Sequence, residues 1–321
     1  MSISSTMSTS PRLAFVGCAS SAGASAGAGG GAGHAPAPGR REVVVRGKRV
    51  KTIDVHAHCI VPEAAQLIHH PLEAPGLLWS NLGDRLAQMD RTGVDVEALS
   101  INPYWYRAER DAVAELIRVQ NEALVEFCAS QPERFVAFAT AALQYPDLAA
   151  EQVEHAVKTL GFRGIGVAGS VAGADLAHPQ FHPFWAKCEA LGVLVFLHPL
   201  GTRELEPSGR LAGNGLLTNT IGNPLETTIA LSHLIFEGTL DRFPGLKICA
   251  AHGGGFLPSY ANRSDAVITT LPTRVGPFAD EEADRISPRR PAVFRFDHVH
   301  GRGHAAPDRR GGDRSRGPRD R

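Results

Sequence analysis

The sequence predicts an α/β protein of the (β/α)8 or TIM-barrel type, with six clear strand–helix units and a degraded last pair. Uninterrupted apolar segments alternate with amphipathic ones between residues 52 and 266, which is typical of a parallel sheet covered by helices. A barrel gathers the carboxyl ends of its strands around one mouth, and the glycine-rich fingerprint of a dinucleotide-binding sheet is missing here. Polar residues stand at the carboxyl ends of four apolar segments, namely His58, Asn102, His198 and His252.

Each strand is predicted from an apolar run without the alternation that half-exposed strands show. The six runs cover residues 52–59, 94–101, 135–143, 164–169, 193–198 and 246–252. Helices are predicted where apolar residues recur three or four positions apart, at residues 82–89, 112–128, 148–160, 184–191 and 225–240. Glycine favours the end of a helix, and four glycines stand just before a strand: Gly93, Gly161, Gly192 and Gly245.

The composition divides the chain into three parts. Residues 1–42 are rich in Ala, Gly and Ser and are expected to be flexible, residues 43–270 should form the barrel, and residues 271–321 should form a disordered tail rich in Arg, Pro and Gly. A short apolar run at residues 13–18 leaves export through a degenerate N-terminal signal open as the alternative to a cytoplasmic location.

Charge and hydropathy exclude two classes of partner. The 33 basic and 33 acidic residues balance to a formal net charge of +0, so the chain has no overall positive field to attract a nucleic acid. The arginine-rich tail has no interleaved aromatic residues on which bases could stack. No apolar stretch reaches the roughly 18 residues of a membrane span. We therefore expect an enzyme that acts on a small molecule, without a nucleic acid or a membrane as partner.

Three histidines form the predicted metal site. His56 and His58 stand two positions apart in the first strand, so their side chains should point to the same side. His198 ends the apolar run at residues 193–197, and Pro199 stops that strand directly after it. Neutral imidazole nitrogens are common zinc ligands, so these residues predict a divalent metal, with zinc as the expected ion.

His252 is predicted to be a general acid or base. It precedes three consecutive glycines, at residues 253–255, which let the backbone approach a ligand closely. A His-Gly-Gly-Gly run also forms the oxyanion hole of some esterases, but no Gly-x-Ser-x-Gly nucleophile motif follows it here. Proton transfer beside a metal is therefore the favoured role for this residue.

These segments together resemble the amidohydrolase superfamily and, within it, the branch of amino-carboxymuconate-semialdehyde decarboxylase and related metal-dependent decarboxylases. They occur in the same order as in that branch, over roughly residues 50–266. The matching segments are IDVHAH at 53–58, MDRTGVD at 89–95, PERF at 132–135, LHP at 197–199, PLETTIA at 224–230, RFPGLK at 242–247 and AHGGGF at 251–256.

The resemblance implies a role for each candidate residue. His56, His58 and His198 would bind the divalent metal, usually zinc, which lowers the pKa of bound water toward about 7. His252 would act in proton transfer. Arg263 would bind a substrate carboxylate across the interface of a homodimer. The pocket for the small carboxylate is expected to be lined by Asn102 and Trp105.

The implied reaction is the decarboxylation of a small unsaturated or aromatic carboxylic acid. A metal-dependent hydrolase of a lactone, amide or ester from the same superfamily stays open as an alternative, because it would share the barrel and the metal. Arg263 and the segment at residues 224–230 favour the decarboxylase.

Two departures from the family put full activity in question. Residues 61–82 hold no counterpart of the second substrate arginine of the muconate enzyme. The Gly-Thr-Asp turn that completes the family's metal site is also missing, and the arginine-rich tail stands where the last two strands are expected. We interpret the tail as the product of a frameshift, with Asp297 as the substitute carboxylate. Impaired catalysis, or an inactive relic, is a further alternative.

Overall fold

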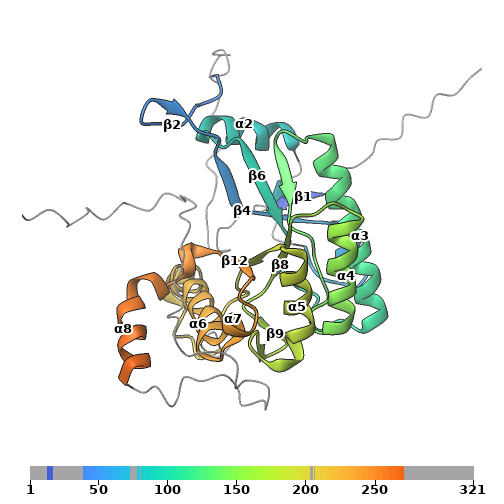
Figure 1. Ribbon diagram of the computed structural model, residues 1–321. Helices are drawn as coiled ribbons and strands as arrows, with labels where there is room; N and C mark the ends of the chain where they lie inside the picture. The colour runs from blue at the N-terminus through green and yellow to red at the C-terminus, as the bar shows by residue number, and fades with distance from the viewer. Residues whose placement is uncertain are drawn as a thin grey trace, which may run out of the picture.

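The computed structural model describes residues 13–16, 39–72, 78–79, 81–202, 205 and 207–270. Six strands run parallel in chain order, and helices cover their outer side (Figure 1). The predicted TIM-barrel type of α/β fold is thus confirmed. The two remaining units, Asp297 and the proposed frameshift all fall beyond residue 270, outside the described residues.

The parallel strands form two ladders that meet at one bridge. The first ladder has the order β4-β6-β7 and the second the order β8-β11-β12. A parallel bridge between Ala139 and Ile165 joins the two ladders. The third strand, β7, is shorter than the predicted run at residues 135–143, because its ladder pairing ends at Ala137. The bounds are Ile53–Ile60 for β4, Val96–Ser100 for β6, Phe135–Ala137 for β7, Gly164–Val167 for β8, Leu194–Leu197 for β11 and Lys247–Ala250 for β12.

The helices follow the predicted order. The helix α2 begins after Asn81, whose side chain accepts hydrogen bonds from the backbone of Gly83 and Asp84, and it ends at Gly93 in the left-handed conformation. The helix predicted at residues 225–240 is divided, because Gly238 adopts a φ of 76° and separates α6 from α7. The bounds are Leu82–Thr92 for α2, Arg110–Ser130 for α3, Pro146–Lys158 for α4, His182–Leu191 for α5, Asn223–Phe236 for α6, Thr239–Arg242 for α7 and Leu257–Thr270 for α8.

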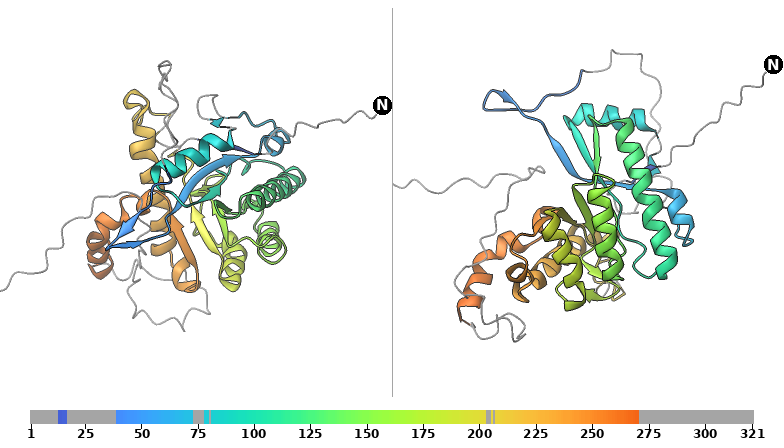
Figure 2. Two further views of the ribbon diagram at one scale, coloured as in Figure 1. Left: turned by 90° about the horizontal axis from the view of Figure 1, so that it is seen from above. Right: turned by 45° about the vertical axis from the view of Figure 1, so that its right-hand side comes forward.

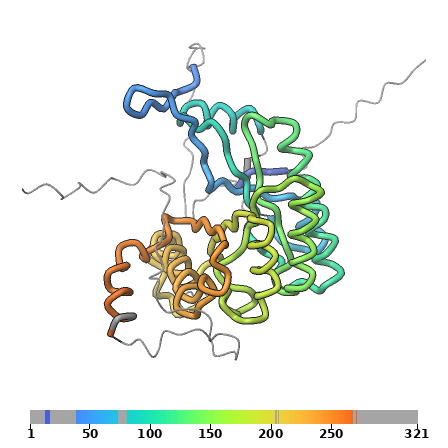
Figure 3. Tube along the Cα trace, in the orientation of Figure 1, coloured from blue at the N-terminus to red at the C-terminus, as the bar shows by residue number. Residues whose placement is uncertain are grey.

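Shorter elements connect these units. The trace in Figure 3 shows the hairpin of β2 and β3 extending from the N-terminal half, and α8 in the C-terminal half. No helix in the described part of the chain combines the length with the apolar character that crossing a bilayer requires. The remaining bounds are Val44–Val45 for β2, Lys48–Arg49 for β3, Pro62–Gln66 for α1, Leu78–Trp79 for β5, Ser170–Val171 for β9, Ala174–Asp175 for β10, Pro179–Phe181 for η1, Gly213–Gly215 for η2, Thr218–Gly222 for η3 and His252–Gly254 for η4.

The buried apolar side chains of the described residues form two clusters. The larger one lies between the strands and the outer helices and includes the fully buried Trp185 and Phe184 of α5, which packs beside α4 (Figure 2). The smaller one holds Phe138 and Phe196, whose rings stack at 4.8 Å between centroids. The ring of Phe196 also lies 6.0 Å from that of His56. The smaller cluster therefore borders the side chains at the ends of the strands.

Part of the segment expected to be flexible is structured instead. Ala14–Val16 forms β1, which pairs antiparallel with both β4 and β5. Phe15 is 2% exposed and its ring lies 5.6 Å from that of Phe127. Arg40 also forms an ion pair of 2.6 Å with Asp95. The composition predicts flexibility for residues 1–42, whereas at Phe15 the apolar side chains of the barrel provide a surface that buries the ring.

Replacing Phe15 with alanine is expected to lower the free energy of unfolding by about 3 kcal/mol, because a buried aromatic ring would leave a cavity against α3 and β7. Urea unfolding of the full chain measures this change. Val45→Ala is the control, since that side chain is 51% exposed and its loss should change stability by less than about 0.5 kcal/mol. Equal losses in the two variants would mean that β1 does not pack as described.

Candidate metal centre

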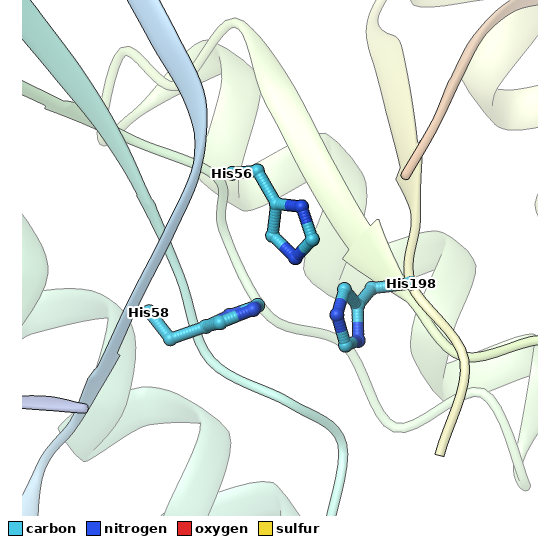
Figure 4. Close-up of side chains that lie close together, drawn as sticks. All are labelled: His56, His58 and His198. Atoms are coloured by element: carbon cyan, nitrogen blue, oxygen red, sulfur yellow. The ribbon is translucent and has the colours of Figure 1, made fainter. Parts of the chain in front are cut away.

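Three imidazole rings meet at the carboxyl ends of β4 and β11 (Figure 4). His56 and His58 come from β4, and His198 directly follows β11. One nitrogen from each ring can be chosen so that all three lie within 4.8 Å of one another. The ring centroids of His58 and His198 are 4.5 Å apart, and each lies 4.8 Å from that of His56. The residues that the sequence assigned to the metal are thus brought together.

The backbone explains how these rings converge. The pairing of β4 with β6 shifts register between Asp54 and Ala57, so His56 lies within a bulge. The Asp54 carboxylate accepts a hydrogen bond of 2.9 Å from the backbone N–H of His56. His198 continues the ladder one residue past β11, where its backbone N–H donates to the carbonyl of Val167. The strands therefore aim all three side chains at one point.

The burial of this cluster favours neutral rings. Burial lowers the pKa of His58 to about 3 and, aided by the neighbouring imidazoles, lowers the pKa of His198 well below its usual range. Within the described residues, Nε2 of His58 and both ring nitrogens of His198 are buried without a hydrogen-bond partner. Such unpaired polar atoms are costly, and a divalent cation would satisfy Nε2 of His58 and the one nitrogen of His198 that carries a lone pair. The residues present therefore fit a divalent metal.

Ser100 orients one of the three rings. Its hydroxyl lies 3.0 Å from Nδ1 of His58 and donates to the carbonyl of Ala57 at 3.3 Å. With the hydroxyl proton on that carbonyl, the oxygen can accept from Nδ1–H, a tautomer that leaves Nε2 of His58 with its lone pair. Metal-binding histidines commonly have such a partner on the other nitrogen. We did not single out Ser100 from the sequence, although it lies two residues before Asn102 in the same apolar run.

His252 lies beside the three rings. Its ring centroid is 5.1 Å from that of His56 and 5.3 Å from that of His198. Burial, with a smaller contribution from His56, lowers the pKa of His252 to about 4. The residue adopts a φ of 56°, uncommon for a side chain with a Cβ, at the start of the glycine run. The hydroxyl oxygen of Thr227 lies 3.2 Å from Nδ1 of His252. The sequence alone indicated no role for Thr227.

The three residues expected to contact substrate lie in different environments. Asn102 follows β6, and its Oδ1 is buried with no hydrogen-bond partner in the described part of the chain. Trp105 is fully buried, and its indole N–H donates to the carbonyl of Ala141 at 3.0 Å. Arg263 is exposed on α8. The burial and the hydrogen bond of Trp105 indicate a packing role for this residue. A substrate contact by Trp105 or by Arg263 stays a prediction.

The metal-free protein is expected to lose stability between pH 7 and pH 5. The pKa values of His58 and His198 lie below 6.5 in the folded chain and return to about 6.5 on unfolding, so the unfolded state binds more protons. Stability present at pH 7 is therefore lost as the pH falls below about 6.5, by roughly 2 kcal/mol for each buried ring at pH 5. Urea unfolding at several pH values measures this loss. His58→Gln should show a smaller dependence, and identical slopes would contradict the assignment.

A barrel with a cluster of neutral histidines at the carboxyl ends of its strands defines a metal-dependent enzyme class. The comparison with known families narrows this class. A family model described as amidohydrolase matches residues 53–276 of the chain. The chain therefore belongs to the amidohydrolase family.

Several relatives are decarboxylases. The chain is 33% identical over 232 residues to the gamma-resorcylate decarboxylase of Rhizobium sp. (strain MTP-10005), covering 66% of this chain and 69% of the relative. It is 31% identical over 176 residues to the 2-amino-3-carboxymuconate-6-semialdehyde decarboxylase of Dictyostelium discoideum, covering 54% of this chain. The matched part covers 48% of that relative, so the chain spans about half of the relative's length.

A solved structure shows the same fold. It is the dihydroxybenzoic acid decarboxylase of Polaromonas sp. JS666, with bound manganese and the inhibitor 2-nitroresorcinol. The two structures superpose with a TM-score of 0.58 and share 29% sequence identity. The match covers 66% of this chain and 68% of the Polaromonas chain.

Proposed function

We propose that this chain is a metal-dependent decarboxylase of a small aromatic or unsaturated carboxylic acid. The observation that carries the proposal is the convergence of His56, His58 and His198 beside His252 at one end of the strands. The family and the decarboxylase relatives support the same reaction. The dihydroxybenzoate decarboxylases among the solved structures favour an aromatic substrate that carries a hydroxyl group beside its carboxylate.

His56, His58 and His198 would hold the ion, and a bound divalent cation would supply positive charge for the substrate's oxygen atoms. The donors found among the described residues are all imidazoles, a set that suits zinc, whereas manganese usually takes more oxygen ligands. We therefore propose zinc, although the related Polaromonas structure contains manganese. Elemental analysis of protein from medium that contains both metals tests this choice. One equivalent of zinc would support it, and one of manganese would overturn it.

His252 would move the proton that the reaction needs. Its Nε2 is the nitrogen not directed to Thr227, so it is available to take a proton from a substrate hydroxyl and pass it to the ring carbon that bears the carboxylate. That carbon gains the proton, its bond to the carboxylate breaks, and carbon dioxide leaves while the electron pair stays with the ring. The unpaired Oδ1 of Asn102 would accept a hydrogen bond from a substrate hydroxyl.

A homodimer would bring Arg263 of one subunit to the substrate carboxylate of the other. The exposure of this arginine on α8 is compatible with that role. Light scattering of the purified chain tests the assembly: a monomer at micromolar concentration would contradict it. The cytoplasmic location stays a prediction from the sequence.

Carbon dioxide release from a panel of substrates tests the reaction. The panel should hold 2,6-dihydroxybenzoate and other hydroxylated benzoates, a carboxylated muconate semialdehyde, and lactones, amides and esters for the hydrolase alternative. We expect release from a hydroxylated benzoate, abolished by His252→Gln and retained by the surface control His155→Gln. Ester or lactone hydrolysis without decarboxylation would favour the alternative, which the decarboxylase relatives do not support. No turnover at one bound metal per chain would indicate the inactive relic.

A further inference from the structure

Two consecutive threonines on α6 face the turn that carries His252. Thr227 is fully buried, and its hydroxyl donates to the carbonyl of Asn223 at 3.0 Å. The hydroxyl of Thr228 donates in the same way to the carbonyl of Pro224 at 2.8 Å. Each hydroxyl has a single proton, and each uses it on the preceding turn of its own helix. Both oxygens are therefore left as acceptors.

Both acceptors are used by the turn at residues 252–256. The oxygen of Thr228 accepts from the backbone N–H of Phe256 at 2.7 Å, while the oxygen of Thr227 lies 3.2 Å from Nδ1 of His252. The backbone of Gly255 packs so closely here that an added Cβ would lie 2.4 Å from the hydroxyl oxygen of Thr228. The helix α6 thus binds the turn at both ends, through a ring nitrogen and through a backbone amide.

We propose that Thr227 is a positioning residue that fixes the tautomer of His252. Because its hydroxyl proton is committed to Asn223, Thr227 can only accept from His252, which requires a proton on Nδ1. Nε2 then keeps its lone pair on the other side of the ring. A catalytic significance for this tautomer rests on the proposed function, but the tautomer itself does not depend on it.

Burial protects this acceptor from replacement by water. A neutral imidazole in water exchanges between two tautomers, and a hydrogen bond to one nitrogen decides which one dominates. Thr227 is 0% exposed, so water cannot readily take the place of its oxygen. The ring is also held by a backbone with a φ of 56°, which the glycine turn maintains. Loss of the oxygen should therefore release the tautomer while the ring stays in place.

The test compares Thr227→Val with Thr227→Ser. Valine keeps the shape of threonine without an acceptor, and serine keeps the acceptor. Long-range ¹H–¹⁵N correlation spectra of the metal-free chain at pH 7 report which nitrogen of His252 carries the proton, with His252→Gln to assign the signal. We expect the Nδ1–H form in the unchanged chain and in Thr227→Ser, and a mixture or the Nε2–H form in Thr227→Val. An Nδ1–H form that persists in Thr227→Val overturns the proposal.

Three further measurements separate this proposal from the proposed function. The melting temperature and the metal affinity of Thr227→Val should match those of Thr227→Ser, which shows that the valine variant folds. With a turned-over substrate, Thr227→Val should lower kcat by about 10–100-fold and change KM little, as expected when a residue that orients a reacting group is lost. If the tautomer shifts as expected but no variant releases carbon dioxide, the decarboxylase proposal fails and the positioning role stands. A kcat loss of the same size in Thr227→Ser would overturn the positioning role.

Discussion

Replacing His198 with glutamine is expected to weaken metal binding by at least about 100-fold, because substitutions that merely disturb the orientation of a ligand already cost about 10–100-fold. The ring of His198 lies 4.5 Å from that of His58 and 4.8 Å from that of His56, so its removal leaves only two imidazoles to share an ion. Titration of the metal-free chain with zinc, in competition with a chromophoric chelator, measures the change.

His155→Gln is the matched control for this experiment. His155 is an exposed histidine on α4, and it lies outside the cluster that could hold a metal. Its replacement should leave the zinc affinity and the stoichiometry of one ion per chain unchanged. Equal zinc affinity in His198→Gln and His155→Gln would contradict the three-histidine site and, with it, the basis of the proposed function.

Replacing Gly255 with alanine is expected to lower the free energy of unfolding by more than about 3 kcal/mol, through strain and overpacking together. An added Cβ would lie 2.2 Å from the carbonyl oxygen of Pro224 and 2.4 Å from the hydroxyl oxygen of Thr228. Gly255 also has a φ of 65° with a ψ of −131°, a conformation that residues with a Cβ rarely adopt. Denaturant unfolding of the metal-free chain measures the loss.

Gly253→Ala separates backbone strain from overpacking. Gly253 has a similar φ of 63°, but an added Cβ would meet nothing within 4 Å. This variant should lose only about 1–2 kcal/mol, the cost of a left-handed conformation for an alanine. If both variants lost the same amount, the close packing of the turn against α6 would be wrong.

The sequence predicted the repeating part of the fold well. The strand at residues 193–198 was predicted from a continuous apolar run, and β11 covers Leu194–Leu197. The helix predicted at residues 112–128 corresponds to α3 at Arg110–Ser130. Local rules suffice for these elements, since strands buried on both faces and helices with one apolar face each leave a periodic pattern.

Other features depend on contacts between residues that are far apart in the sequence. The strand β1 forms because the ring of Phe15 packs against Phe127 and Phe135, which are far away in the sequence. The segment around it reads as a flexible one, since Ala, Gly and Ser dominate its composition. Thr227 lies within a segment that resembles the family, but nothing in that segment indicates that its hydroxyl reaches His252.

By itself, the sequence determined the order of strands and helices and named the histidines that end the strands, because apolar periodicity and the breaks in it are properties of neighbouring residues. Only the tertiary structure decided how these histidines are used. The depressed pKa values of His58 and His198 arise from burial by segments that are distant in the chain. The same holds for the hydrogen bonds of Ser100 and Thr227, which depend on distances across the barrel that no local pattern encodes.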